Sequence, residues 1–98
     1  MTSRPFQFHP EAEAEFAEAA EWYDERRPGL GRNFVAAVRA KVDEIRGAPE
    51  RWPSVRGVRR TLVHRFPYAV VYREVENEMI QIIAVAHVRR RPKYWSTR

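Results

Sequence analysis

The spacing of apolar residues predicts two amphipathic helices in the first half of the chain. Apolar side chains recur at helical intervals through residues 10–27, and again at steps of three and four through residues 30–47. Pro10 suits a helix start, because the N–H group that it lacks would be unpaired there anyway. Pro28-Gly29 ends the first helix. Since only a few residues separate the helices, they should form an antiparallel hairpin.

After the second helix the pattern changes to that of β-strands. Residues 68–72 and 79–88 are apolar on both faces, as in central strands, and the polar residues 74–78 between them can form a turn. Residues 55–65 contain strand-like stretches and should lie beside this hairpin. The alternating Phe6-Gln7-Phe8 adds a short strand before the first helix.

This order of elements predicts the fold class. We expect a single domain over residues 1–98 with an N-terminal helical hairpin packed on a mainly antiparallel, twisted sheet, in the order β-α-α-β-β-β. A chain of 98 residues, 44% of them hydrophobic, can bury one modest core in such an α+β arrangement. The sheet face opposite the helices must then carry the remaining side chains.

Charge is divided unevenly between the two halves of the chain. Residues 1–50 hold 7 Lys or Arg against 10 Asp or Glu, whereas residues 51–98 hold 11 against 3. The basic half favours an anionic partner, either nucleic acid or an acidic protein surface. Nearly all of its cations are arginine, which makes forked contacts with phosphate and carboxylate. A GC-rich genome is an alternative explanation for that preference.

Several classes of protein are excluded by composition. The absence of cysteine removes disulfides and thiolate zinc sites, and no apolar stretch is long enough to cross a bilayer. The spacing of His, Asp and Glu resembles no metal site. We therefore expect no cofactor, no metal and no membrane association, and the composition is compatible with a reducing cytoplasm without requiring it.

The end of the last predicted strand brings charge and aromatic rings together. Residues 84–95 read AVAHVRRRPKYW, with His87, three arginines, Tyr94 and Trp95 in close succession. We predict that the core stops here and a contact surface begins. The alternatives are that the arginines form only a solvated face and that His87 caps the strand through a backbone hydrogen bond. Trp22, beside the stripe of the first helix, is either core or a contact for a partner.

At this point the chain resembles the RelE/ParE superfamily of toxins from bacterial type II toxin–antitoxin systems. The resemblance rests on the order of elements, on PYAVVYRE (67–74), on IQIIAVAHVRRRP (80–92) and on the closing KYW. It covers nearly the whole chain and is most specific from Arg65 to Trp95. It implies a small cytoplasmic toxin that a co-expressed antitoxin wraps and holds inactive, in a hetero-oligomer.

The superfamily has two branches with different targets. The RelE-like branch cleaves mRNA on the ribosome without metal, and the ParE-like branch poisons DNA gyrase and lacks nuclease chemistry. RNA cleavage needs a base, an acid and cations that hold the phosphate. If this chain were a nuclease, the resemblance would place His87, Tyr94 and Arg65 in the catalytic set. Neighbouring arginines would then be expected to lower the pKa of Tyr94.

Position by position, the nuclease pattern is incomplete. Tyr94 matches the C-terminal tyrosine of the superfamily and Arg60 matches one basic position. However, Leu62, Ala69 and Val88 stand where RelE-like toxins carry basic residues. The His87-Val88-Arg89 step and the length of the helical hairpin look more like the ParE branch. We therefore favour a gyrase inhibitor, with an mRNA endonuclease and a nucleic-acid-binding accessory module as alternatives.

We expect two sets of binding residues on this chain, one for the target and one for the antitoxin. The target, gyrase or the ribosome with its mRNA, should contact Arg59, Arg60, Arg65, His87, Arg89, Arg90, Tyr94 and Trp95. The antitoxin, through an acidic and amphipathic tail, should contact Trp22, Arg59, Arg65 and Arg90, together with an apolar groove beside the helices.

Overall fold

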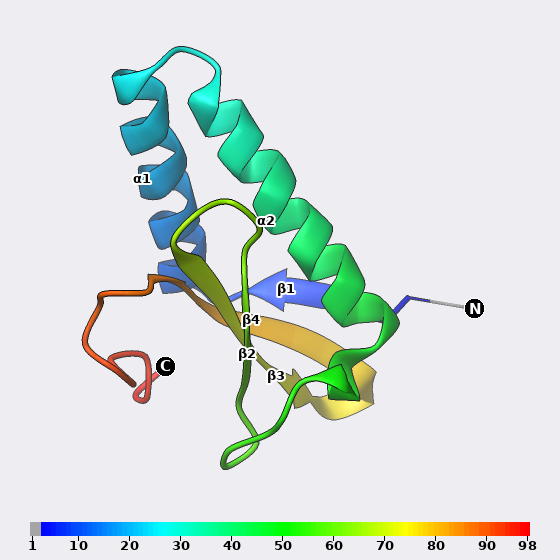
Figure 1. Cartoon of the computed structure of the whole chain (residues 1–98). Coiled ribbons are helices and arrows are strands. Elements are labelled where there is room, and N and C mark those ends of the chain that lie inside the picture. Colours follow the sequence, from blue (N-terminus) through cyan, green and yellow to red (C-terminus); the bar gives the residue numbers. More distant parts are fainter. Residues whose placement is uncertain (1–2) are drawn as a thin grey trace.

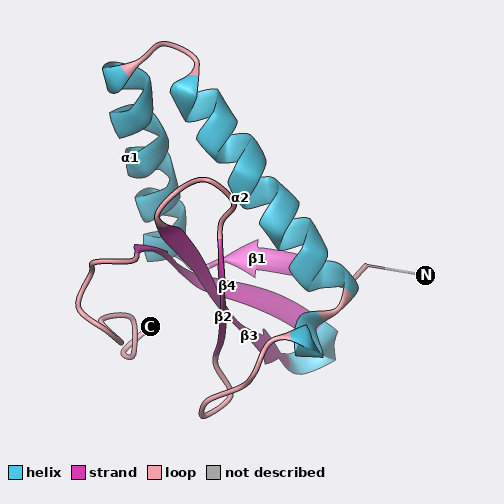
Figure 2. Cartoon of the chain, viewed as in Figure 1, coloured by secondary structure: helices cyan, strands magenta, loops and turns pink. Residues whose placement is uncertain are grey.

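The computed structural model describes residues 3–98 and confirms the predicted order of elements (Figure 1). The elements are strand β1 (Phe6–Phe8), helix α1 (Pro10–Arg26), helix α2 (Leu30–Gly47), the 3-10 turn η1 (Pro49–Arg51), strand β2 (Arg59–Leu62), strand β3 (Tyr68–Val75), the 3-10 turn η2 (Glu76–Glu78) and strand β4 (Met79–His87). Figure 2 shows both helices on one side of the sheet, which is the expected α+β arrangement.

Local hydrogen bonds determine where the helices begin and how they connect. His9 precedes α1, and its Nδ1 accepts a hydrogen bond of 3.1 Å from the N–H of Glu11, which caps the helix. Between the helices, Asp24 Oδ1 accepts hydrogen bonds from the N–H groups of Gly29 and Gly31, at 3.2 and 2.8 Å. Gly29 has a φ of 91°, which glycine adopts without strain. Asp24 thereby holds the tight connection that makes the helices antiparallel.

The sheet is mixed, with the strand order β1-β4-β3-β2. Strands β2, β3 and β4 are antiparallel, as predicted, while β1 runs parallel to β4. β1 pairs only with residues 80–82 of β4. On that side, residues 83–87 of β4 have no neighbouring strand within the described chain. Such an edge leaves N–H and C=O groups that other parts of the chain must satisfy.

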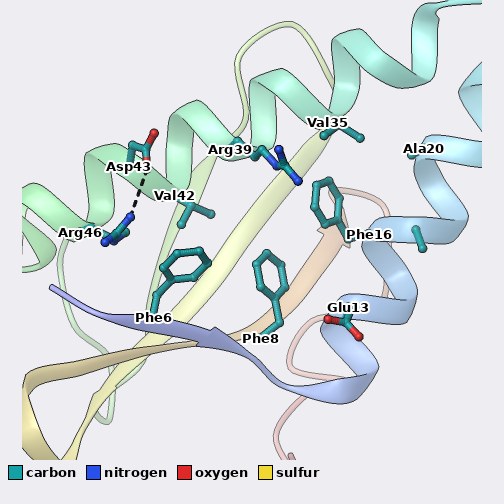
Figure 3. A pocket seen from close by; sticks show the side chains of 11 residues that line it. Phe6, Phe8, Glu13, Phe16, Ala20, Val35, Arg39, Val42, Asp43 and Arg46 are labelled. Carbon is teal, nitrogen blue, oxygen red and sulfur yellow. Dashed lines mark ion pairs between the residues drawn. The ribbon is translucent and has the colours of Figure 1, made fainter. Parts of the chain in front are cut away.

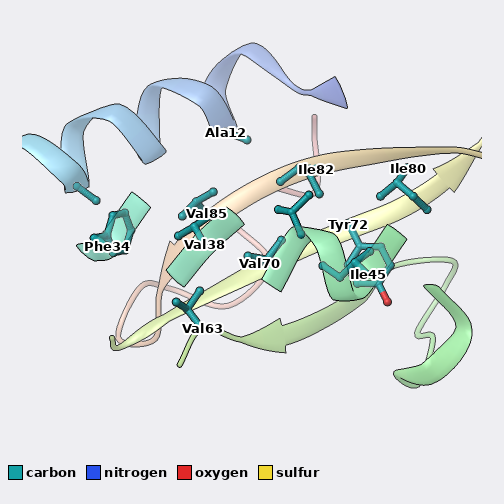
Figure 4. Close-up of a cluster of buried hydrophobic side chains, with 12 residues drawn as sticks. Ala12, Phe34, Val38, Ile45, Val63, Val70, Tyr72, Ile80, Ile82 and Val85 are labelled. Carbon is teal, nitrogen blue, oxygen red and sulfur yellow. The ribbon is translucent and has the colours of Figure 1, made fainter. Parts of the chain in front are cut away.

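The main core lies between the helices and the sheet (Figure 4). Phe34 and Val38 of α2 belong to the same cluster as Val70 and Tyr72 of β3, and all four side chains are fully buried. The Tyr72 hydroxyl donates a hydrogen bond of 2.6 Å to the carbonyl oxygen of Pro49, and burial raises the pKa of Tyr72 to about 12. This buried bond ties η1 to the sheet.

The strand predicted over residues 55–65 is shorter in the structure. Residues 55–58 form a tight turn whose ends are joined by backbone hydrogen bonds of 2.9 and 3.0 Å, and Gly57 in this turn has a φ of 80°. The chain therefore reverses direction just before β2, which begins only at Arg59. This reversal explains the difference from the sequence-based expectation.

The other face of the sheet, here called the outer face, is partly covered by the chain that follows β4. Val71, Ile83, Ala84 and Ala86 form a second apolar cluster on this face, and Tyr94 and Trp95 pack against it. Figure 1 shows this C-terminal segment, in red, turning back toward the sheet. The outer face therefore consists of both strand residues and residues 88–98.

Candidate binding surface

The register of the strands determines which side chains share the outer face. Arg60 is paired with Val71 and Leu62 with Ala69 across β2 and β3, and Ala69 is paired with Ala86 across β3 and β4. Paired residues and alternate residues along a strand point to the same face of a sheet. Because Val71 and Ala86 belong to the outer cluster, Arg60 and Leu62 lie on the outer face too.

A set of polar side chains attaches the C-terminal segment to helix α1. The Tyr94 hydroxyl donates a hydrogen bond of 2.7 Å to Glu15 Oε2, and the Arg98 guanidinium binds the two Glu15 carboxylate oxygens at 3.0 and 2.9 Å. Glu15 Oε1 also accepts a 3.0 Å bond from the N–H of Val85, and Arg98 donates a 2.9 Å bond to the Ile83 carbonyl. Glu15 and Arg98 thus satisfy backbone groups of β4 beyond the reach of β1. We call Glu15, Tyr94 and Arg98 the C-terminal clasp.

The clasp shifts the pKa values of its members in opposite directions. Burial alone would raise the pKa of Glu15, but the hydrogen bonds from Arg98, Tyr94 and the Val85 N–H outweigh it and lower the pKa. Burial, followed by the hydrogen bond to Glu15, raises the pKa of Tyr94 above its usual value. Arg90 and Arg98 do favour a lower pKa of Tyr94, as expected, but they are outweighed because the phenol is partly buried and its proton is donated to a carboxylate.

We expect the clasp to make stability depend on pH. Because the pKa of Glu15 is lower in the folded state than in the unfolded chain, its contribution is complete well above the ordinary value of 4.5 and is lost as the pH falls through the folded-state value. Urea unfolding at a series of acidic pH values should show the wild type losing more stability than Glu15→Gln below pH 4.5. Parallel losses in the two proteins would contradict this assignment.

Four of the predicted target-binding residues gather around one small cavity in the outer face. Arg60, His87, Arg90 and Trp95 all line this cavity, whose volume is about 80 Å³. The ring of Tyr94 lies beneath the Arg90 guanidinium, which is 4.0 Å from the ring centroid. Five of the eight residues are thus brought together where β4 ends.

The other three predicted residues lie differently. The Arg59 guanidinium donates hydrogen bonds to the backbone carbonyls of Trp52 and Glu50, and so is tied to the chain before β2. Arg65 is exposed in the turn between β2 and β3, with a φ of 71°. Arg89 is exposed after β4, and its N–H donates a 3.0 Å bond to His87 Nδ1. His87 therefore has the strand-capping contact that the sequence left as an alternative.

Trp22 belongs to the surface and not to the core. Its side chain is 47% exposed, and the Arg26 guanidinium lies 4.1 Å from its ring centroid. Trp22 borders a cleft of about 540 Å³ between α1 and the adjoining ends of β3 and β4, and His87 and Arg90 line the same cleft. Trp22 and Arg90, both expected to bind the antitoxin, therefore share one surface.

Two members of the clasp, Glu15 and Arg98, were not among the residues predicted from the sequence. Nothing in the sequence analysis singled Glu15 out from the other glutamates of the first helix, yet it follows the buried Ala12 by three residues and precedes the buried Ala19 by four. That spacing places it on the buried face of α1 and is the signal that could have identified it. Arg98 had no comparable signal, because its contact with Glu15 joins residues 83 positions apart.

A separate groove of about 570 Å³ runs between the two helices and β1 (Figure 3). Phe6, Phe8, Phe16 and Val42 provide its apolar walls, while Arg39 and other charged residues stand at its border. The rings of Phe8 and Phe16 are stacked with their centroids 5.6 Å apart. The groove is thus apolar inside and charged at the rim.

Comparisons with known proteins place this chain in a family. The profile described as "ParE toxin of type II toxin-antitoxin system, parDE" matches residues 6–92. Among solved structures, a chain of the chromosomal ParDE toxin–antitoxin system from P. aeruginosa superposes with a TM-score of 0.74 at 21% sequence identity, over 87% of this chain and 96% of that chain. A likeness at this identity shows a common fold. No curated protein matches the sequence significantly.

Proposed function

This chain belongs to the ParE toxin family of type II toxin–antitoxin systems, and on that premise we propose that it inhibits DNA gyrase by binding it through the outer face of the sheet. The observation that carries the proposal is the hydrogen bond from the Tyr94 hydroxyl to Glu15, because Tyr94 matches the C-terminal tyrosine of the superfamily. Its proton is donated to Glu15 and its pKa is raised, so it is not prepared to act as a base at neutral pH. Binding chemistry fits this surface better than acid–base chemistry.

The exposed side chains of the outer face support the same choice. Leu62 and Val88 are 58% and 44% exposed, at two positions where RelE-like nucleases carry cations. Ala69, at the third such position, is buried in the sheet. A crowded phosphate would meet apolar groups at all three positions. Exposed apolar residues among arginines are typical of a surface that binds protein.

We place the antitoxin mainly on the helical side of the molecule. The groove lined by Phe6, Phe8 and Phe16 can take the apolar face of an amphipathic helix, and Arg39 at its border can pair with acidic residues of that helix. Trp22 and Arg90 in the neighbouring cleft, and the exposed Arg65, extend this contact. Arg59 contributes less than we expected, because backbone carbonyls occupy its guanidinium. Toxin and antitoxin together form the hetero-oligomer.

The compartment is also part of the proposal. Among residues 3–98 no helix is long and apolar enough to span a membrane. A gyrase inhibitor acts where the chromosome lies, so we place this toxin in the cytoplasm. The accessory-module alternative keeps the basic surface but predicts no growth inhibition.

The proposal is tested by expressing the protein briefly without its antitoxin, and by adding the purified protein to purified gyrase. We expect loss of supercoiling activity and gyrase-linked DNA breaks, with transcripts intact, and we expect the antitoxin to reverse both effects. Prompt transcript cleavage with normal gyrase activity would instead support the endonuclease. Normal growth, with gyrase activity and transcripts both unaffected, would instead support the nucleic-acid-binding accessory module.

A further inference from the structure

The small cavity in the outer face has an unusual floor. Ala69 and Ala86 are paired across β3 and β4, and both line the cavity of about 80 Å³. Because their side chains are single methyl groups, they leave space that larger residues would fill. The indole of Trp95 contributes a wall. We call this cavity the alanine socket.

Two arginines at the socket lack acidic partners. Arg60 and Arg90 line it and are exposed, and neither lies within ion-pair distance of a carboxylate of residues 3–98. Arg90 is nevertheless held in place, because its guanidinium stacks on Tyr94, which is bonded to Glu15. A cation that is already positioned loses little conformational entropy when it binds an anion.

The shape and the lining of the socket distinguish between two sources of anion. A nucleic acid would bring bases that stack on open aromatic faces. Arg90 covers a face of Tyr94, and Tyr94 and Trp95 pack against each other with their centroids 5.4 Å apart and an interplanar angle of 75°. The exposed Leu62 beside Arg60 also favours protein, since interfaces with nucleic acid are more uniformly polar and basic.

We infer that the alanine socket receives one Glu or Asp side chain of the protein that the outer face binds. The carboxylate pairs with Arg60 and Arg90, and its methylene stem packs against Ala69, Ala86 and Trp95. The identity of that protein as gyrase rests on the function proposed above, whereas the preference for a carboxylate on an aliphatic stem rests on the socket itself. Buried charge-assisted contacts of this kind are among the strongest in protein interfaces.

The socket can be probed without any target protein. In NMR titrations of the full chain, N-acetyl-glutamate N-methylamide should shift the Trp95 indole N–H and the Ala86 methyl signals. The matched N-acetyl-glutamine N-methylamide should bind at least about 10-fold more weakly, because it lacks the charge. Equal binding of the two compounds, or no shift at Trp95, would overturn the inference. Tighter binding of adenosine monophosphate would overturn the choice of protein over nucleic acid.

Variants test the same socket in the complete toxin. Arg60→Gln removes charge, and Ala86→Val fills the space while keeping all charges. Each substitution should weaken the binding of the glutamate compound and the inhibition of gyrase by about 10-fold or more. Neither should change the affinity for the antitoxin by more than about 2-fold. Arg56→Gln is the matched control, because it removes an exposed arginine in the turn before β2, outside the socket. The Arg56→Gln variant should bind the glutamate compound and inhibit gyrase as the wild type does.

The outcomes separate the two proposals. If the probe binds as expected but the wild-type protein leaves gyrase active, the proposed target is wrong and the socket stands. If gyrase is inhibited but Arg60→Gln and Ala86→Val inhibit it as well as Arg56→Gln does, the socket inference is wrong and the proposed target stands. Retained antitoxin affinity shows that each variant is folded. If Ala86→Val loses affinity for the antitoxin, that variant is misfolded and cannot be used. The result for Arg60→Gln, which changes an exposed side chain, then decides whether the socket inference holds.

Discussion

Replacing Glu15 by leucine should lower the free energy of unfolding by about 2 to 4 kcal/mol. The substitution removes both carboxylate hydrogen bonds of the Arg98 guanidinium, whose side chain is only 9% exposed, and leaves it the exposed Glu11, at 3.3 Å, as its acidic partner. It also removes the acceptor from the Tyr94 hydroxyl and from the N–H of Val85. A largely buried charge then loses its better-buried carboxylate while two donors lose their acceptor, which costs more than the loss of one surface ion pair. Urea unfolding followed by circular dichroism measures the change.

The matched control for this variant is Glu18→Leu. Glu18 lies on the same helix, is exposed, and makes no hydrogen bond or ion pair with the described residues. Its replacement should change stability by no more than about 0.5 kcal/mol. Equal losses in the Glu15 and Glu18 variants would show that the clasp contributes nothing beyond helix propensity.

A double-mutant cycle with Arg98→Leu isolates the coupling within the clasp. Removing both charged partners leaves no buried unpaired ion, so the double variant should be less destabilised than the sum of the single variants by about 1 to 3 kcal/mol. Amide exchange in residues 83–98 should accelerate more than exchange in α2, because the clasp closes the edge of β4. Additive losses would mean that Glu15 and Arg98 act independently.

Gly31→Ala should destabilise the protein by about 2 to 3 kcal/mol. Gly31 lies in the first turn of α2, where that helix passes close to α1. A Cβ atom there would overlap the carbonyl oxygen of Ala20 and lie 2.8 Å from Asp24 Oδ1. The same Asp24 oxygen accepts the N–H of Gly31, so the helices must separate at the point where they are joined. Thermal unfolding should show a lower midpoint.

Gly47→Ala provides the matched control in the same helix. Gly47 is the last residue of α2, and a Cβ atom there would meet nothing within 4 Å. We expect the free energy of unfolding of Gly47→Ala to stay within about 1 kcal/mol of the wild-type value, and the higher helix propensity of alanine favours a small gain. If Gly31→Ala were as stable as Gly47→Ala, the close approach of the helices would not be a constraint on the fold.

Much of the fold could be predicted because it depends on short-range patterns. The helix that begins at Pro10 and the pair of late strands followed from periods of 3.6 and 2 residues in the sequence. The parallel pairing of β1 with β4 could not be predicted, because it joins Phe6 to Ile80 and no local sequence pattern near either residue indicates the partner. The tight turn at 55–58 was missed because Gly57 stands within an otherwise strand-like segment.

The candidate site was only partly predictable, for a similar reason. The gathering of Arg60, His87, Arg90 and Trp95 followed from the expectation that the late strands carry charge on their free face. Arg59, the next residue to Arg60, was grouped with them, although adjacent residues of a strand point to opposite faces. The pKa of Tyr94 could not be predicted, since it depends on its hydrogen bond with Glu15, a helix residue 79 positions away in the chain.

The sequence by itself determined the two helices, the late strands, the basic second half and the resemblance to a toxin family, because each of these depends on residue types and on their spacing over short stretches of the chain. Only the tertiary structure decided that Glu15 and Arg98 close the edge of β4, and that Arg60, Ala69 and Ala86 from three strands form one socket with Arg90 from the turn after β4. Burial and hydrogen bonding at those places depend on neighbours brought together by the sheet, and the energies that fix them arise only once the chain has folded.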